Sequence, residues 1–377
     1  MLLKMMQTIL NQLTYFGFSQ GLFFFLIYIL SPAKRKNVNP YMAFLIFVLL
    51  IGLSGKVLHS MGVWNQNFRL IAFSEFSALL FGSTVYLFTR SVLNKRKISR
   101  QDLIHYIPGL AYSLFILVYF MLPSDEISRA RAATGEIKRA IFACHAIGVL
   151  VNGIYWYLSW KVLQDFYKRI RNEVSYELHT AFIVRFLYVV GACLLIWTIL
   201  YITSLLGYDM IERNARPYIW GILTLIILFI NYYGIISPQV FHFVPDITSK
   251  KYAQSKLTVS DMERLKQELD TLMQEKKPYL NSKLLKAEVA QMLGINNPEL
   301  ARLLNENIGM NFFEYVNYYR IKEFINLAKT EKAKQLTFFG LAQEAGFNSK
   351  TTFNKSFKKL TGTSPSAYFN QNTYDEN

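Results

Sequence analysis

The stretch "EAGFNSKTTFNKSFKKLTGTSP", residues 344–365, decides the fold of the C-terminal part of this chain. Phe353, Phe357 and Leu360 recur in it at helical spacing and predict an apolar face for packing. The remaining positions of this helix carry small polar or basic side chains and no acid: Ser349, Lys350, Thr351, Asn354, Lys355, Lys358 and Lys359. Just before it, Ala342 lets two helices cross closely, and Gly346 supplies a turn four residues later. The stretch therefore predicts two helices joined by a tight turn.

This unit occurs twice in the chain, which is the signature of an internal repeat. "VAQMLGIN" (289–296) and "LAQEAGFN" (341–348) share the same pattern, and Arg302 of the first copy matches Lys355 of the second. The residues between the copies, 311–330, would form a helix about 30 Å long. Recognition helices that enter successive major grooves on one face of DNA lie about 34 Å apart. The repeat and its spacing predict a double helix-turn-helix.

The exposed residues of each second helix are candidates for DNA contact. Amides and hydroxyls suit base edges, and ammonium groups suit phosphates. The candidate DNA-binding residues are Asn297 and Arg302 in the first copy, and Lys350, Thr351, Asn354, Lys355 and Lys358 in the second. Arg302 is the main candidate for base recognition, because a guanidinium can bind guanine through two hydrogen bonds.

Residues 255–370 resemble the DNA-binding domain of AraC-family transcription regulators. The family pattern lies in residues 341–369, at Ala342, Gly346, Phe347, Phe353, Phe357, Lys358, Gly362, Ser364, Pro365 and Tyr368. The resemblance implies a seven-helix, double helix-turn-helix domain that binds double-stranded promoter DNA. It adds Pro298 and Ala301 to the groove-facing positions of the first copy. Lys355 stands where the family often has Arg, so we expect it to contact a phosphate rather than a base.

The N-terminal part of the chain has the composition of a membrane protein. The 377 residues are 52% hydrophobic and 16% aromatic, with a mean hydropathy of +0.20. A helix needs about 20 apolar residues to cross a bilayer. The sequence predicts seven such spans, at about residues 9–30, 40–58, 69–89, 104–122, 140–161, 182–206 and 217–236.

The basic residues predict the orientation of these spans. The net charge is +16, and most of it lies in the apolar part rather than in residues 251–377. The first, third and fifth loops hold 12 Lys and Arg, and the other loops hold 7. Since loops rich in Lys and Arg stay in the cytoplasm, the N-terminus is predicted outside a bacterial inner membrane. Seven crossings then deliver the DNA-binding domain to the cytoplasm.

Ionisable residues inside spans are costly and are often functional. Glu75 and His145 are therefore candidates for ligand binding, and a structural role in packing is the alternative for each. Arg185 lies near the end of a span, where its side chain would extend to the interface. Gly17 and Gly21 form a GxxxG motif, which allows another helix to approach closely and would suit a homodimer.

The chain divides into four parts by this reading. Residues 1–238 form a seven-span sensor or anchor, 239–278 a linker and amphipathic helix, 279–372 the double helix-turn-helix, and 373–377 a tail. Leu265, Leu269 and either Leu272 or Met273 form an apolar stripe on the predicted helix at 260–276. This helix either packs on its own domain or couples the membrane part to the DNA-binding part.

The predicted fold class is all-α, with a seven-transmembrane-helix bundle followed by a cytoplasmic double helix-turn-helix domain. The favoured hypothesis is a membrane-embedded transcription regulator, whose partners are promoter DNA, the lipid bilayer, a small-molecule signal, RNA polymerase and a second copy of the chain. A transcription factor released by proteolysis is one alternative, and a transporter or membrane enzyme with a regulatory tail is another. No catalytic motif, cofactor or metal site is predicted, and Cys144 and Cys193 imply no disulfide framework.

Overall fold

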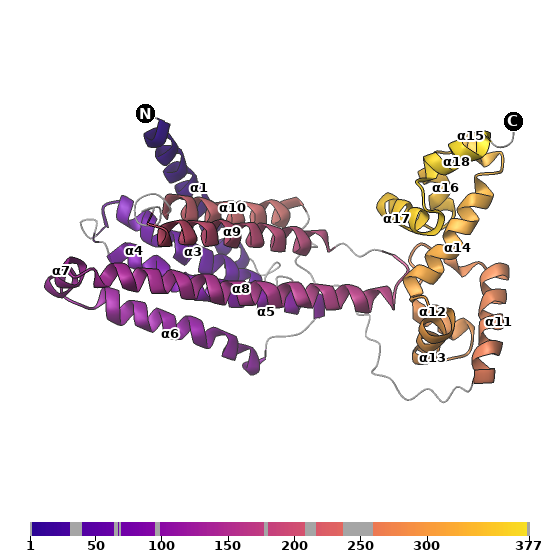
Figure 1. Ribbon diagram of the computed structural model, residues 1–377, viewed down its shortest axis with the longest axis horizontal. Coiled ribbons are helices and arrows are strands. Elements are labelled where there is room, and N and C mark those ends of the chain that lie inside the picture. Colours follow the sequence, from indigo (N-terminus) through magenta and orange to yellow (C-terminus); the bar gives the residue numbers. More distant parts are fainter. Residues whose placement is uncertain are drawn as a thin grey trace. The chain divides into compact units, whose positions relative to one another are not determined.

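The structure is a computed structural model of the chain (Figure 1). It describes residues 2–30, 40–63, 67, 69–94, 99–176, 180–207, 216–236 and 259–374. These residues are almost all helical, and an isolated β-bridge joins Val174 to Leu285. The chain forms two compact units, Met1–Gln164 with His179–Val244, and Asp165–Leu178 with Pro245–Asn377.

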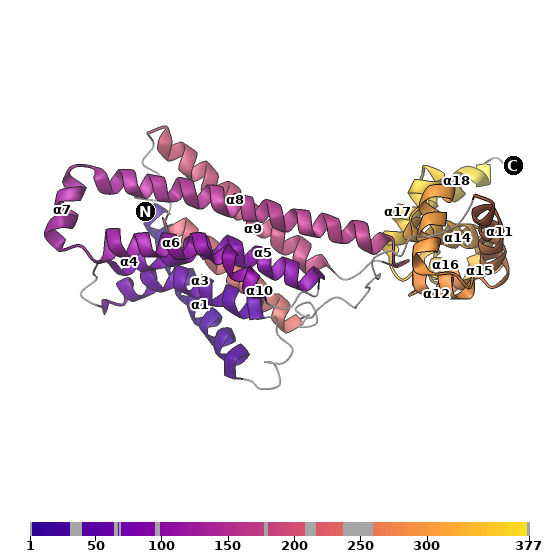
Figure 2. The ribbon, with the colours of Figure 1, turned by 90° about the horizontal axis from the view of Figure 1, so that it is seen from below.

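The first unit is a bundle of long apolar helices (Figure 2). Its elements are α1 (Leu2–Leu30), α3 (Pro40–Ser60), α4 (Arg69–Phe73), η2 (Ser74–Ser77), α5 (Ala78–Asn94), η3 (Arg100–Tyr106), α6 (Ile107–Ile116), η4 (Leu117–Met121), α7 (Asp125–Ala133), α8 (Glu136–Arg171), α9 (Ala181–Leu205) and α10 (Arg216–Ile236). Helix α3 packs against α1, α4, η2 and α5, so most of its side chains are buried.

Large apolar side chains also cover the outside of this unit. Leu110, Leu150 and Leu195 each expose more than 60% of their surface. An exterior of this kind suits lipid, because a soluble protein rarely leaves so much apolar surface in contact with water. Among the described residues, six helical segments are long and apolar enough to cross a membrane. The prediction of seven is therefore met for six, since the apolar part of α10, Tyr218–Tyr233, is shorter than the others.

The glycines of the predicted GxxxG motif pack inside the first unit. A Cβ atom on Gly17 would lie 2.4 Å from the side chain of Thr224, and one on Gly21 would lie 3.2 Å from that of Ile227. Both neighbours are on α10, so the motif allows α1 and α10 of the same chain to approach closely. This use accounts for the two glycines without a second copy of the chain.

The second unit contains the predicted repeat and the residues around it. Its helices are α11 (Val259–Glu275), η7 (Pro278–Leu280), α12 (Lys286–Met292), α13 (Asn297–Arg302), η8 (Leu303–Ile308), α14 (Phe312–Leu327), α15 (Lys332–Gln335), α16 (Phe338–Glu344), α17 (Lys350–Thr361) and α18 (Pro365–Tyr374). The last two turns of α8 and the residues after them also belong to this unit.

Helix α14 joins the two halves of the second unit. Phe312 and Val316 at its start lie in one hydrophobic core with α12 and α13. Ile321 and Phe324 lie in a second core with α16 and α17. At 16 residues the helix is about 24 Å long, which is shorter than the 30 Å predicted from residues 311–330.

Helix α11 contributes its apolar stripe to the first of these cores. Leu265, Leu269 and Met273 are at most 3% exposed, and they pack in the core that contains Val289 and Leu300. The packing favours the interpretation in which this helix belongs to its own domain. The stripe is consequently buried within one unit and offers no surface for pairing two chains.

Candidate nucleic-acid interface and ligand cavity

The second copy of the repeat folds as a helix-turn-helix. Ala342 is fully buried at the crossing of α16 and α17, and Gly346 adopts a φ of 96° in the turn. A Cβ atom at Gly346 would lie 2.3 Å from the carbonyl oxygen of Tyr279, so the position requires glycine. Ser349 then caps α17 by accepting a hydrogen bond from the amide of Thr352 at 3.3 Å. The roles predicted for Ala342 and Gly346 are confirmed.

The two faces of α17 separate as the sequence predicts, with one exception. Phe353 and Phe357 are buried against Phe324 of α14, with ring centroids 4.6 and 5.6 Å from it. Leu360, which the spacing assigned to the same face, is 43% exposed. The predicted DNA-contacting residues of this copy are all exposed: Lys350, Thr351, Asn354, Lys355 and Lys358.

The first copy presents a smaller polar surface. Its recognition helix begins as α13 and continues as the π-helical turn η8, and Asn296 caps it by accepting from the amide of Glu299 at 2.9 Å. Asn297 and Pro298 are half-buried, and Ala301 is only 4% exposed. Ala301, a groove-facing position by the resemblance, is therefore a packing residue here.

Arg302 forms an ion pair within its own helix. Its Nε lies 2.8 Å from Oε2 of Glu306, one turn later, and its side chain is 34% exposed. A guanidinium in this position can donate to a base or a phosphate only after its contact with Glu306 is rearranged. The first copy thus offers fewer groups to DNA than the second copy does.

An ion pair connects α14 to the recognition helix α17. Lys359 Nζ donates to Oε1 of Glu314 at 2.5 Å. Burial works to raise the pKa of the Glu314 carboxyl, but the hydrogen bond and charge of Lys359, a backbone hydrogen bond at Asn311 and the charge of Arg171 together lower it. The carboxylate is therefore ionised at neutral pH, and it holds Lys359 beside the exposed DNA-contacting candidates of α17.

The first unit contains a cavity of about 120 Å³ lined by Glu75 and His145, among other residues. Both residues also line an adjoining cavity of about 240 Å³. Tyr112 donates to Oε2 of Glu75 at 3.2 Å, and the indole nitrogen of Trp197 donates to Nδ1 of His145 at 3.1 Å. An Nδ1 that accepts a hydrogen bond leaves the proton of the neutral imidazole on Nε2. The structure thus brings the two predicted ligand-binding residues to one place.

Two further polar residues line the smaller cavity, and the sequence analysis missed both. Asn152 is 1% exposed and donates to the carbonyl oxygens of Ala78 and Gly148, but its Oδ1 has no hydrogen-bond partner. The hydroxyl of Ser74 is also buried without a partner. The sequence does hold a signal for Asn152, which is a lone asparagine in the middle of an apolar span. A buried amide oxygen without a hydrogen-bond partner is costly, so such a residue is a candidate for ligand binding.

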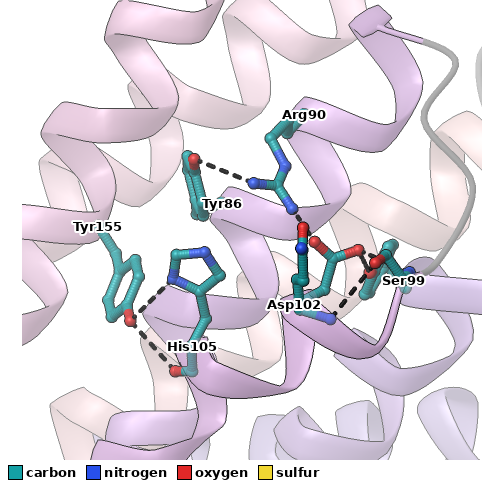
Figure 3. A network of polar contacts seen from close by, with 8 residues as sticks. Tyr86, Arg90, Ser99, Asp102, His105 and Tyr155 are labelled. Atoms are coloured by element: carbon teal, nitrogen blue, oxygen red, sulfur yellow. Dashed lines mark hydrogen bonds and ion pairs between the residues drawn. The ribbon is translucent and has the colours of Figure 1, made fainter.

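A polar network joins three elements elsewhere in the first unit (Figure 3). Arg90 of α5 is half-buried and forms an ion pair with the buried Asp102 of η3. Tyr155 of α8 donates to the carbonyl oxygen of His105, also on η3, at 3.1 Å. Arg90, which the topology prediction counted only as a loop cation, is therefore part of the bundle. Arg185 is exposed on α9 and donates to the hydroxyl of Tyr233 on α10.

Among the described residues, no group of three or more His, Cys, Asp and Glu side chains is placed to hold a metal ion. Cys144 and Cys193 are free thiols.

Comparison with known families identifies the repeat. Residues 289–371 match a family model described as a helix-turn-helix domain, and this range covers both copies. No curated protein and no solved structure matches the chain. Together with the geometry above, the match shows that the C-terminal part of the chain is an AraC-type helix-turn-helix domain, as the resemblance of residues 255–370 implied.

Proposed function

We propose that this chain is a membrane-bound transcription regulator that binds promoter DNA in a sequence-specific manner and couples this binding to a signal received by its apolar bundle. The observation that carries the proposal is the helix-turn-helix match over residues 289–371 in a chain with six membrane-compatible helical segments. The exposed polar surface of α17 supports DNA contact, because it combines amide and hydroxyl groups with four lysines and no acid.

The segments that make up the second unit support seven crossings of the membrane by the chain. The loop after α8 and the helix-turn-helix belong to one compact unit, so they lie on the same side of the membrane. The number of crossings between them is therefore even. Since α9 is 25 residues long and strongly apolar, its crossing requires that α10 crosses as well. The basic residues Lys168, Arg169 and Arg171 support a cytoplasmic location for that side.

The cavity around Glu75 is the proposed site for the signal. It lies among α3, α5, α8, α9 and α10, where a bound molecule would contact five helices at once. Its lining is apolar apart from a few polar groups, which is typical of small-molecule sites. Glu75, Asn152 and Ser74 supply oxygen atoms for a ligand that carries hydrogen-bond donors.

The experiment that tests this function uses the full chain in lipid nanodiscs. A library of genomic fragments is incubated with the nanodiscs, and the bound DNA is sequenced at several salt concentrations. A reproducible enrichment of one motif is expected. Equal recovery of all fragments at every salt concentration would show that the chain does not recognise a sequence. Transport by reconstituted chain without residues 245–377 would instead favour the transporter alternative.

A further inference from the structure

A short segment between two membrane helices is built into the DNA-binding unit. Val174 forms an antiparallel bridge with Leu285, just before α12. The amide of Lys286 donates to the carbonyl oxygen of Glu173 at 3.0 Å, and the amide of Ser175 donates to that of Leu284 at 3.2 Å. Glu173, Val174 and Ser175 are all buried. We call these three residues the docking segment.

A buried ion pair fixes the docking segment to α12. Nζ of Lys286 lies 2.7 Å from Oε1 of Glu173, and the two side chains are 1% and 9% exposed. Lys286 is the first residue of α12, the helix that opens the first helix-turn-helix. If either partner is removed, the other charge remains buried without compensation, which is strongly destabilising. The first copy of the repeat therefore depends on a carboxylate that comes from the loop after α8.

A buried arginine fixes the same segment to α14. Arg320 is 1% exposed, and it donates to the carbonyl oxygen of Ser175 at 2.7 Å and to its hydroxyl at 3.0 Å. The same guanidinium donates to the carbonyl oxygens of Tyr279 and Asn281 at 2.8 and 2.7 Å. The docking segment thus braces α12 against α14, the helix that holds both halves of the unit together.

The docking segment follows directly from the helix that lines the ligand cavity. Helix α8 is continuous over 36 residues, from Glu136 to Arg171, and it carries His145 and Asn152. Its length is about 54 Å, well beyond the roughly 30 Å hydrocarbon thickness of a bilayer. One continuous helix therefore connects the cavity wall to the docking segment.

We propose that the docking segment controls DNA affinity: while it is docked, it braces the first helix-turn-helix, and its withdrawal by α8 loosens that half and weakens DNA binding. This inference rests on the proposed DNA-binding function and adds a mechanism by which DNA binding is regulated. The stretch of chain after α10 that leads to α11 is then a second connection between the units rather than the route of the signal.

A cysteine pair tests whether the segment docks in the full chain. The 174–285 bridge is flanked by hydrogen bonds, so it is a non-hydrogen-bonded pair, and its Cα atoms lie at a separation that a disulfide can span. Val174→Cys with Leu285→Cys, in a Cys144→Ser and Cys193→Ser background in nanodiscs, is expected to form this disulfide on mild oxidation. The oxidised variant should bind the enriched DNA motif as the wild type does.

Release variants test whether docking matters for DNA. Glu173→Gln and Ser175→Ala in the full chain are expected to lower the affinity for the motif at least about tenfold, and to accelerate hydrogen exchange at the amides of Ser175 and Lys286. Glu126→Gln, an exposed glutamate on α7, is the matched control and should change neither quantity. Adding Lys286→Met to Glu173→Gln should recover part of the affinity, because no unpaired charge is left buried.

The outcomes separate this inference from the proposed function. Wild-type affinity in both release variants, together with rapid exchange at Ser175 in the wild type, would overturn the docking proposal and leave DNA recognition intact. Failure of the cysteine pair to form a disulfide would also count against docking. If the wild type shows no sequence preference at all, the proposed function fails, and protected amides with an efficient disulfide would still establish the docked segment.

Discussion

The guanidinium of Arg302 has two candidate partners, a base of bound DNA and Glu306 of its own helix. If it reads a guanine, Arg302→Ala should cost about 1–3 kcal/mol on the preferred motif and relax the preference at one position. Lys358→Ala, on the exposed face of α17, should instead weaken binding to all sequences and reduce the salt slope by about one. Binding measured across single-base variants of the motif distinguishes the two. An equal loss on every DNA for Arg302→Ala would assign Arg302 to a phosphate.

Two glycines of the second helix-turn-helix, Gly346 and Gly340, allow a test substitution and a matched control for the stability of this unit. Gly346→Ala forces a side chain into a φ of 96° and against the carbonyl oxygen of Tyr279, so it should destabilise the unit by at least about 2 kcal/mol. Gly340 lies inside α16, where a Cβ atom would meet its nearest neighbour at an ordinary 3.4 Å. Gly340→Ala should therefore be neutral or stabilising.

Hydrogen exchange at the amides of α16 and α17 in the full chain measures both effects. Faster exchange in the Gly346 variant and unchanged or slower exchange in the Gly340 variant are expected. Similar exchange in the two variants would show that the turn at Gly346 tolerates a side chain.

At the scale of elements, the pair Glu314–Lys359 contributes to the contact between α14 and α17. The pKa of Glu314 is lowered in the folded chain, so the pair stabilises the contact at neutral pH and loses this effect as the pH falls through the lowered pKa. Because Lys359 is 70% exposed, we expect no more than about 1 kcal/mol from it.

Glu314→Gln should accordingly reduce the stability of the α14–α17 contact at pH 7 and have no effect in acid below that pKa. Exchange rates of α17 amides, measured for both chains from pH 7 downwards and corrected for the intrinsic rate, check this. A difference between the chains that stays constant with pH would exclude the ion pair as its cause.

The local elements of the DNA-binding unit could be predicted from the sequence, because their signals are local. The repeated pattern with Ala342 and Gly346 specifies a small crossing residue and a positive φ, and the structure has both. The docking segment could not be predicted in this way. Ser175 and Arg320 are 145 positions apart, and nothing in the loop after the fifth span marks it as part of another domain.

The same distinction applies to the candidate sites. Glu75 and His145 stand out in the sequence as ionisable residues in apolar spans, but their meeting in one cavity depends on how η2 and α8 pack. Leu360 was assigned to a buried face by its spacing alone, although it lies in the last turn of α17, where the core of the unit ends. The half-burial of Asn297 and the Glu306 contact of Arg302 likewise follow from tertiary packing and side-chain geometry.

At the scale of the whole molecule, the cavity and the DNA-binding unit can be separated by mutation. Glu75→Gln replaces the carboxyl group in the cavity wall by an amide without changing any residue of the second unit. It should leave the affinity of the nanodisc-embedded chain for its motif unchanged and alter the expression response of its target genes in cells. Asn152→Leu, which removes the unpartnered Oδ1, should act in the same direction. An unaltered response in both variants would make the two residues structural.

If the docking segment holds the second unit, proteolytic release requires undocking of this segment as well as cleavage of the linker. A protease site inserted within residues 245–255 would cut the chain but leave Glu173 and Ser175 in contact with Lys286 and Arg320. The cleaved C-terminal fragment should therefore stay with the nanodiscs, and the Glu173→Gln variant should release it faster. Sedimentation of the nanodiscs after cleavage measures this. Immediate release from the wild type would show that the covalent linker is the main attachment.

The continuity of α8 with the docking segment also limits how such a protein can be recombined. A helix turns by about 100° per residue, so one residue added between Asn152 and Arg171 would rotate the docking segment by this angle about the axis of α8, relative to the cavity-lining residues of that helix. Four added residues would bring it back close to its original face. Chimeric sensors that join this DNA-binding module to a foreign membrane part should therefore include residues 165–178, because these residues belong to the module. The junction should also keep the helical phase of α8.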